Sequence, residues 1–183
     1  LAVVFGFCAV AMIGIMVYFS CIDTKTDLGS FERIIRFNDI WGTHRGFMWI
    51  RSIWIFGDAS FIEKLFGVGP DMFYSAFSPY FDDLSKYGDS STNAAHNEYL
   101  NYLITIGITG LLSYLAIVCG TIKNAVKYAK ENPMLIACVS AVICYAVQSV
   151  VNLYQPITTP LFFIFIALCE AFVRNAKAEK SAV

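Results

Sequence analysis

The sequence predicts an all-α, polytopic membrane protein with four spanning helices and a large extracytoplasmic loop that carries an interfacial amphipathic helix. Hydrophobic residues make up 57% of the 183 residues and charged residues only 15%, whereas soluble domains are roughly 25% charged. The apolar residues gather in four runs, at 1–22, 98–122, 134–154 and 156–173. Because a bilayer core takes about 20 apolar residues per helix and leaves no water for backbone groups, each run is predicted to be a transmembrane helix.

Composition also excludes several other classes. Low hydrophobicity and high charge keep chains disordered, and this chain has the opposite character. A net charge of −1 gives no general field for a phosphate backbone, so no nucleic-acid partner is expected. The cysteines lie in or at the end of apolar runs and form no CxxC pair, so we expect neither a disulfide framework nor a metal site.

The apolar runs have simpler interpretations. Each could be a buried core helix, although soluble cores rarely need runs of about 18 residues or more. The first run could be a secretory signal, but it has no initiating Met and no basic region before it. We therefore expect the chain to be the C-terminal part of a longer protein with further helices upstream.

Short connections predict the orientation. Segment 123–133 holds three Lys and one Glu, and the tail 174–183 holds Arg174, Lys177 and Lys180 against Glu179. Positively charged short loops stay in the cytoplasm. This places the loop 23–97 outside the cytoplasm, and the protein in the cytoplasmic membrane as a multi-pass protein.

The predicted extracytoplasmic loop contains a candidate interfacial helix. Residues 45–56 suit an amphipathic helix, with Phe47, Ile50 and Trp54 on one face. Trp side chains favour the membrane–water interface. The alternative is a helix packed on a small external core. All three Trp residues lie in this loop, at Trp41, Trp49 and Trp54.

Farther along the loop, Gly67-Val68-Gly69-Pro70 predicts a tight, restricted turn. It lacks the third glycine of a dinucleotide fingerprint and the Lys of a P-loop, so nucleotide binding is not expected. Residues 74–89 are aromatic and then acidic, and they are predicted to form a loop over the membrane.

The segment before the second run holds the acid–base candidates. Asn93 is predicted to be the N-cap of that helix, which places His96 in its first turn. The positive end of a helix attracts anions and disfavours a protonated imidazole, so His96 should be neutral and able to accept a proton. A polar cap is the simpler role for a single His. Glu98 is a second acid–base candidate, or a surface carboxylate facing lipid headgroups.

Several blocks in this part of the chain occur in one order, and together they resemble the O-antigen ligase and O-antigen polymerase family of bacterial membrane proteins. The family pattern has an Arg before a Trp, a Gly-x-Gly-Pro turn and a His-Asn motif that leads into a glycine-containing helix. Here the blocks are Thr43-His44-Arg45-Gly46-Phe47-Met48-Trp49, Phe66-Gly67-Val68-Gly69-Pro70, Ala95-His96-Asn97-Glu98-Tyr99-Leu100 and Ile106-Gly107-Ile108-Thr109-Gly110-Leu111.

The resemblance implies transfer of a glycan from an undecaprenyl-diphosphate-linked donor to an acceptor saccharide or glycolipid, at the outer face of the membrane and without metal or cofactor. It implies His96 as the general base on the acceptor hydroxyl and Arg45 as the group that holds the diphosphate. Arginine suits that role because its fork is bidentate and never deprotonates. Asn97, Glu98, Trp49 and Arg51 are candidate substrate-binding residues.

Arg33, Arg36 and Arg51 also lie in the loop and could join a diphosphate site.

Two other functions compete with glycan transfer. A polytopic transporter module is the first alternative. Transport pathways usually carry charges at midplane depth. In the last three apolar runs, however, the charged residues are Glu98, at the very start of its run, and Glu170, near the end of its run. A non-catalytic membrane subunit is the second alternative. The sequence does not separate ligase from polymerase.

Overall fold

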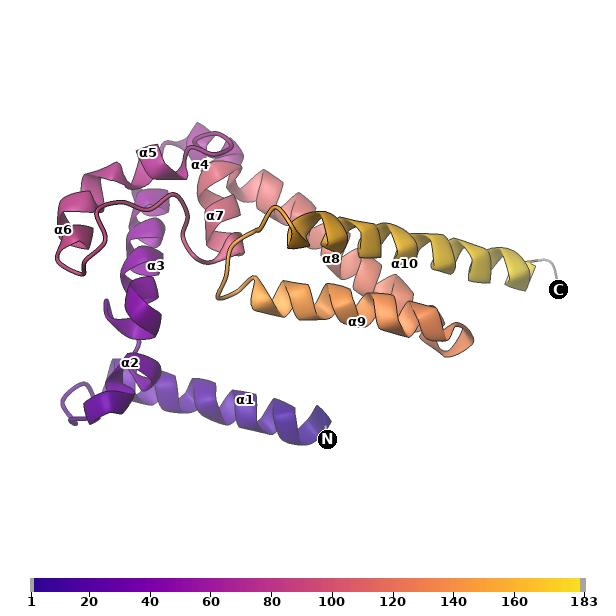
Figure 1. Ribbon diagram of the computed structural model, residues 1–183, viewed down its shortest axis with the longest axis horizontal. Coiled ribbons are helices and arrows are strands. Elements are labelled where there is room, and N and C mark those ends of the chain that lie inside the picture. The colour runs from indigo at the N-terminus through magenta and orange to yellow at the C-terminus, as the bar shows by residue number, and fades with distance from the viewer. Residues whose placement is uncertain (1, 182–183) are drawn as a thin grey trace.

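A computed structural model describes residues 2–181, with the backbone alone at 2–9 and 131. The first residue of the predicted first span and the last two of the predicted tail lie outside this range. Helices account for 75% of the structure, and no strand occurs in the described residues. The all-α class is therefore confirmed. Figure 1 shows a bundle of helices near the C-terminus, a cluster of helices beyond its end, and the N-terminal helix apart from the bundle.

The bundle consists of α8 (Gly107–Tyr128), α9 (Pro133–Gln148) and α10 (Thr158–Ser181), which lie side by side (Figure 1). Its core includes Leu135, Val142, Phe162 and Val173, while many apolar side chains on the outside stay exposed. In the described part of the chain, α8 alone is long and apolar enough to cross a membrane; Val10–Ile22 and α9 are shorter apolar helices. The four predicted spans are not confirmed as a set and stay a prediction.

The single helix predicted over 98–122 is wrong. The chain instead forms α7 (Glu98–Thr105) and α8, with a break at Ile106, where φ is −124° and ψ 4°. The next residue, Gly107, has a φ of +70°. Figure 1 shows α7 running across the end of the bundle rather than continuing α8. The apolar run does not reveal this bend, because the residues of α7 and those at the start of α8 are both largely apolar.

The other predicted helix ends shift as well. In the N-terminal run, α1 (Ala2–Val17) continues as a π-helical turn over Tyr18–Ile22. In the third run, α9 ends at Gln148, six residues before the predicted end. In the fourth, α10 continues through the predicted tail to Ser181. Lys123 to Tyr128, predicted as loop, belong to α8.

The segment between α1 and α7 folds around a core of its own. It contains α2 (Glu32–Ile35), α3 (Trp41–Asp58), α4 (Phe61–Phe66), α5 (Phe73–Phe77) and α6 (Phe81–Ser85). The helix predicted over 45–56 is present as part of α3. However, Phe47 is buried in this second core, whereas Trp54 is half exposed, so the two do not share one environment. The structure shows the alternative, a helix packed on a small core, and the position of this core outside the cytoplasm stays a prediction. The core residues are Phe47, Met48, Phe73, Phe77, Leu84, Ala95 and Ile104.

The loop predicted over 74–89 is also wrong, because most of it is helical. The rings of Phe73 and Phe77 stack with centroids 5.4 Å apart, and both side chains are buried. Leu84 of α6 is buried in the same core. Burial of these apolar side chains holds α5 and α6 against α3 and α7.

Candidate functional site

The Arg45 side chain follows a strained turn near the start of α3. Gly42, Thr43 and His44 have left-handed backbone conformations, with φ of 57°, 58° and 68°. Such conformations cost a non-glycine residue of order 1–3 kcal/mol and occur often at functional sites. The His44 ring lies against Tyr87, with centroids 4.8 Å apart. The turn is therefore supported by a ring contact from a distant segment.

The residues after Arg45 fix its place in the fold. The Phe47 N–H donates a hydrogen bond to the Asp39 carbonyl at 3.2 Å. A Cβ at Gly46 would overlap with the Asn38 carbonyl, so only glycine lets α3 approach the preceding linker this closely. Arg45 is half-buried, and within residues 2–181 no hydrogen bond or ion pair engages its guanidinium. The backbone at Arg45 is thus fixed, and its guanidinium is open to a ligand.

Two other arginines of this segment already have partners. Arg51 forms a bidentate ion pair with Asp39, at 2.6 and 2.9 Å, and its guanidinium lies over the rings of Phe47 and Trp54. Arg36 donates to the Thr26 carbonyl at 2.7 Å and to Glu32 at 2.9 Å. Both arginines serve the local fold, which leaves Arg45 as the better candidate for an anionic ligand.

His96 lies just before α7, in a left-handed conformation with a φ of +51°. The N-cap of α7 is Asn97, whose side chain accepts from the Leu100 N–H at 3.0 Å, so the prediction of Asn93 as N-cap is wrong. His96 therefore precedes the helix. Asn97 is buried and engaged in this cap, which leaves its proposed contact with substrate as a prediction.

The environment of His96 lowers its pKa. Burial is the main cause, the positive charge of Arg45 is the second, and the carboxylate of Asp89 opposes both. The sequence predicted a neutral imidazole, and the lowered pKa has the same direction. Its causes are burial and Arg45, however, and not the positive end of a helix. Because the Arg45 charge acts on His96, the structure brings the two groups into one electrostatic environment, although they are far apart in sequence.

Glu98 is not a surface carboxylate. Its side chain is 1% exposed and accepts hydrogen bonds from the Tyr102 hydroxyl at 2.9 Å and the Ser149 hydroxyl at 2.7 Å. The Glu98 N–H also donates to the Ser149 carbonyl at 2.9 Å. These bonds tie the start of α7 to the end of α9 and so position the His96 segment. Sequence reasoning missed Ser149, because it lies about fifty residues from Glu98 and no motif links the two.

Trp49 packs against Trp41 at the start of α3 and against Phe37 in the linker before it. Its ring centroid lies 5.1 Å from that of Trp41 and 6.0 Å from that of Phe37, and its indole Nε1 is buried without a partner among the described residues. Trp49 and Arg51 thus stabilise the helix that carries Arg45, and their contact with substrate stays a prediction.

The Gly-x-Gly-Pro turn is explained by its contact with the break between α7 and α8. The N–H groups of Val68 and Gly69 donate to the carbonyls of Ile104 and Thr105, at 2.9 and 3.0 Å. A Cβ at Gly67 would overlap with the Thr105 backbone, and one at Gly107 would overlap with Leu65. Two sequence blocks forty residues apart therefore meet backbone to backbone, which their spacing alone did not indicate.

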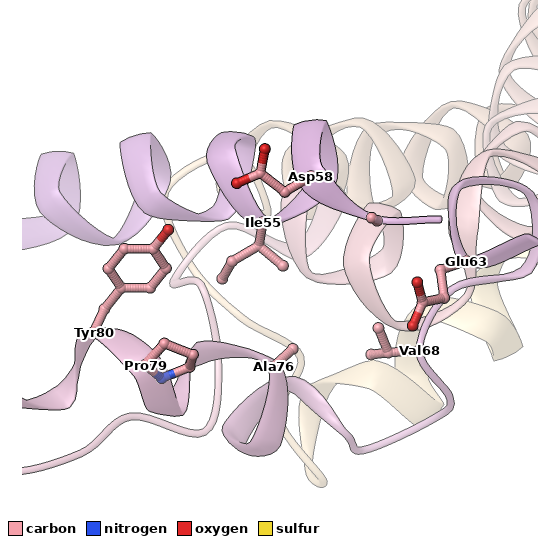
Figure 2. Close-up of a pocket in the computed structure, with 8 residues that line it drawn as sticks. Ile55, Asp58, Glu63, Val68, Ala76, Pro79 and Tyr80 are labelled. Carbon is pink, nitrogen blue, oxygen red and sulfur yellow. The ribbon is translucent and has the colours of Figure 1, made fainter. Parts of the chain in front are cut away.

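Another cavity has a volume of about 300 Å³, and neither His96 nor Arg45 lines it. Figure 2 shows the residues on its wall. The cavity lies between α3, α4 and α5, with apolar side chains such as Ile55 and Val68 on its wall. The Glu63 carboxylate at its edge is engaged by the Ser60 N–H in the cap of α4. This cavity contributes neither a cation nor an imidazole to the candidate site.

Comparison with known proteins gives one result. The profile of the family described as O-Antigen ligase matches residues 1–115, which is more than half of the chain. No curated protein and no solved structure matches. The matched range contains the left-handed turn before Arg45, the Gly-x-Gly-Pro turn, His96 and the break at Gly107. The chain belongs to the O-antigen ligase family.

Proposed function

We propose that this protein transfers a glycan from an undecaprenyl-diphosphate-linked donor to an acceptor saccharide or glycolipid at the outer face of the cytoplasmic membrane. Family membership indicates an activity of the O-antigen ligase or polymerase type in the bacterial inner membrane. The donor, the acceptor and the membrane face belong to the proposal.

One observation carries the proposal: burial and then a neighbouring arginine, Arg45, lower the pKa of His96, and that arginine has no hydrogen bond or ion pair within residues 2–181. A cation with open donors is what a diphosphate leaving group needs, because negative charge develops on it as the sugar–phosphate bond breaks. A neutral imidazole is what an acceptor hydroxyl needs, because it must lose its proton as it attacks. The two groups therefore match the two ends of one displacement reaction.

The chemistry can be written as a single step. The acceptor hydroxyl oxygen attacks C1 of the donor sugar while His96 Nδ1 or Nε2 takes its proton. The bond between C1 and the phosphate oxygen breaks, and undecaprenyl diphosphate leaves with its new charge beside Arg45. The displacement inverts the anomeric centre, and His96 then loses its proton to solvent. Every group in this step is a side chain or a substrate atom.

The arrangement of helices supports a site at the membrane surface. α3 lies across the end of the bundle, outside the ends of α8 and α10 that lie near α7 (Figure 1). Lys123, Lys127 and Lys177 lie toward the other end of these helices. Because positively charged ends face the cytoplasm, α3 and His96 fall on the outer side in the proposed topology. Trp54, half exposed on α3, then lies near the headgroups.

The test uses full-length protein in nanodiscs with lipid-linked donor and acceptor. His96→Ala should lower the transfer rate by roughly 10²–10⁴-fold, as loss of a general base does. Arg45→Ala should lower it by about 10²-fold or more, with Arg45→Lys in between. Arg174→Ala is the matched control, because Arg174 is an exposed arginine near the other end of α10, away from His96 and Arg45. Unchanged transfer by both His96→Ala and Arg45→Ala, at normal protein levels, would falsify the proposal.

A further inference from the structure

A second cleft lies at the joint between α7 and α8, and neither His96 nor Arg45 lines it. Its volume is about 370 Å³, within the range of roughly 300–1,000 Å³ that small-molecule sites occupy. Three parts of the chain form it: the Gly-x-Gly-Pro turn, the end of α7 and the segment that enters α10. The lining residues are Pro70, Asp71, Tyr102, Thr105, Ile106, Tyr154 and Thr159.

Two polar groups of the cleft are open to a ligand. The Asp71 side chain is exposed, and no hydrogen bond or ion pair engages its carboxylate within the described chain. Its backbone is left-handed, with a φ of +62°, a strained conformation that is concentrated at binding and catalytic sites. Tyr154 is 40% exposed, and its hydroxyl makes no hydrogen bond within residues 2–181.

The other wall of the cleft is held rigidly. The Tyr102 hydroxyl donates to Glu98, so its ring is fixed beside the cleft. The Thr159 hydroxyl accepts from the Gln155 N–H at 3.1 Å and pairs with the Tyr145 hydroxyl at 2.7 Å. A wall of this kind is preorganised, so a ligand does not lose affinity by ordering it.

Charge and polarity decide which ligand fits. None of the lining residues is cationic and Asp71 is an anion, so the cleft disfavours a diphosphate. The open carboxylate and phenol would lose hydrogen bonds to water against a polyprenyl tail, so the cleft disfavours lipid too. A neutral saccharide suits both groups. Its hydroxyls donate to a carboxylate and accept from a phenol, and its C–H face packs on an aromatic ring.

We propose that this cleft binds a neutral saccharide residue of the donor glycan or of the acceptor, apart from the diphosphate site at Arg45. The assignment to these two substrates rests on the proposed function. From Asn97 to Tyr102 and Thr105, the two lining residues of α7, a helical rise of about 1.5 Å per residue gives about 8–12 Å. The bound residue is therefore not the reacting one, but another unit of the same glycan, and the cleft contributes affinity rather than chemistry.

The test compares two conservative variants with two matched controls in full-length protein in nanodiscs. Asp71→Asn removes the charge and keeps a residue that tolerates a left-handed backbone, and Tyr154→Phe removes one hydroxyl. Asp82→Asn and Tyr74→Phe are the controls, because both side chains are exposed and lie outside the cleft. Steady-state KM is measured for donor and acceptor separately, and inhibition by sugar-free undecaprenyl diphosphate is measured in parallel.

Asp71→Asn is expected to raise one KM roughly tenfold, as loss of a charge-assisted hydrogen bond does, with kcat and inhibition by undecaprenyl diphosphate unchanged. Whichever KM rises identifies the donor or the acceptor as the source of the saccharide. Unchanged KM values for both substrates overturn the proposal.

A binding measurement separates this proposal from the proposed function. Saturation-transfer NMR with oligosaccharide released from the donor lipid by mild acid, and with deacylated acceptor saccharide, needs no turnover. Wild-type protein should bind one of them, and Asp71→Asn should weaken that signal while Asp82→Asn does not. If wild-type protein binds but transfers nothing, the proposed function fails and the cleft stands. If Asp71→Asn binds both saccharides as well as wild type, the cleft assignment fails.

Discussion

Replacing Gly107 by alanine tests the contact that joins the Gly-x-Gly-Pro turn to the start of α8. Gly107 has a φ of +70°, which L-residues adopt only with strain. An added Cβ would lie 2.5 Å from the Leu65 carbonyl carbon and 2.6 Å from the Gly67 nitrogen. Both are backbone atoms, so no side-chain rotation relieves the overlap.

The expected cost follows from these two effects. A left-handed backbone costs a residue with a Cβ about 1–2 kcal/mol. Overpacking a filled site adds about 1–3 kcal/mol, because neighbouring backbone must move. Gly107→Ala should therefore lower the free energy of unfolding by about 2–5 kcal/mol. Gly120 lies in the same helix, and a Cβ added there would meet no neighbouring side chain or segment within 4 Å, so Gly120→Ala should be stabilising by about 0.5–1 kcal/mol.

Thermal and denaturant unfolding in detergent, followed by circular dichroism, measures the difference between the two alanine variants. The midpoint of Gly107→Ala should fall well below wild type, and that of Gly120→Ala should stay level or rise. Transfer activity should fall with Gly107→Ala even at temperatures where the protein is folded, because the end of α7 and the start of α8 shift. Equal midpoints for the two variants would refute the role assigned to this contact.

Two further predictions concern the His96 segment. Transfer needs neutral His96, so the transfer rate should fall as the pH drops through the pKa of His96. Arg45 lowers this pKa and Asp89 raises it, so Arg45→Gln should move the fall to higher pH and Asp89→Asn to lower pH. The measurement is a pH–rate profile of the transfer that each variant retains. Ser149→Ala removes one donor from buried Glu98 and should cost about 1.5–3 kcal/mol of unfolding free energy, measured by denaturation in detergent; an unchanged midpoint would contradict the proposed tie.

Part of this fold was predictable because it depends on composition and local periodicity. The all-α class follows from long apolar runs, and the helix over 45–56 follows from its amphipathic pattern. The direction of the pKa shift of His96 was predicted from the positive end of a helix, but its causes are burial and then the charge of Arg45. The main cause, burial, depends on packing that the local sequence does not contain.

The remaining features depend on partners far away in the chain. Asn93 and Asn97 are equally good N-caps by residue type, and tertiary contacts select Asn97 by pairing the Glu98 N–H with the Ser149 carbonyl. The break before Gly107 needs Leu65 and Gly67 beside it. Neither partner is visible in a window of neighbouring residues, so an apolar run that contains a bend was predicted as one helix.

The two groups of the proposed reaction lie on strained backbone rather than within regular helix. Arg45 directly follows a left-handed turn, and His96 is itself left-handed. Such conformations persist only where the surroundings over-determine them. Here the surroundings are rigid, because Gly46 lies against the Asn38 carbonyl beside Arg45, and the Glu98 bonds to Ser149 fix α7 beside His96. The strain at each residue is therefore balanced by a tight contact or by hydrogen bonds next to it, which explains how the backbone of both residues keeps an irregular conformation.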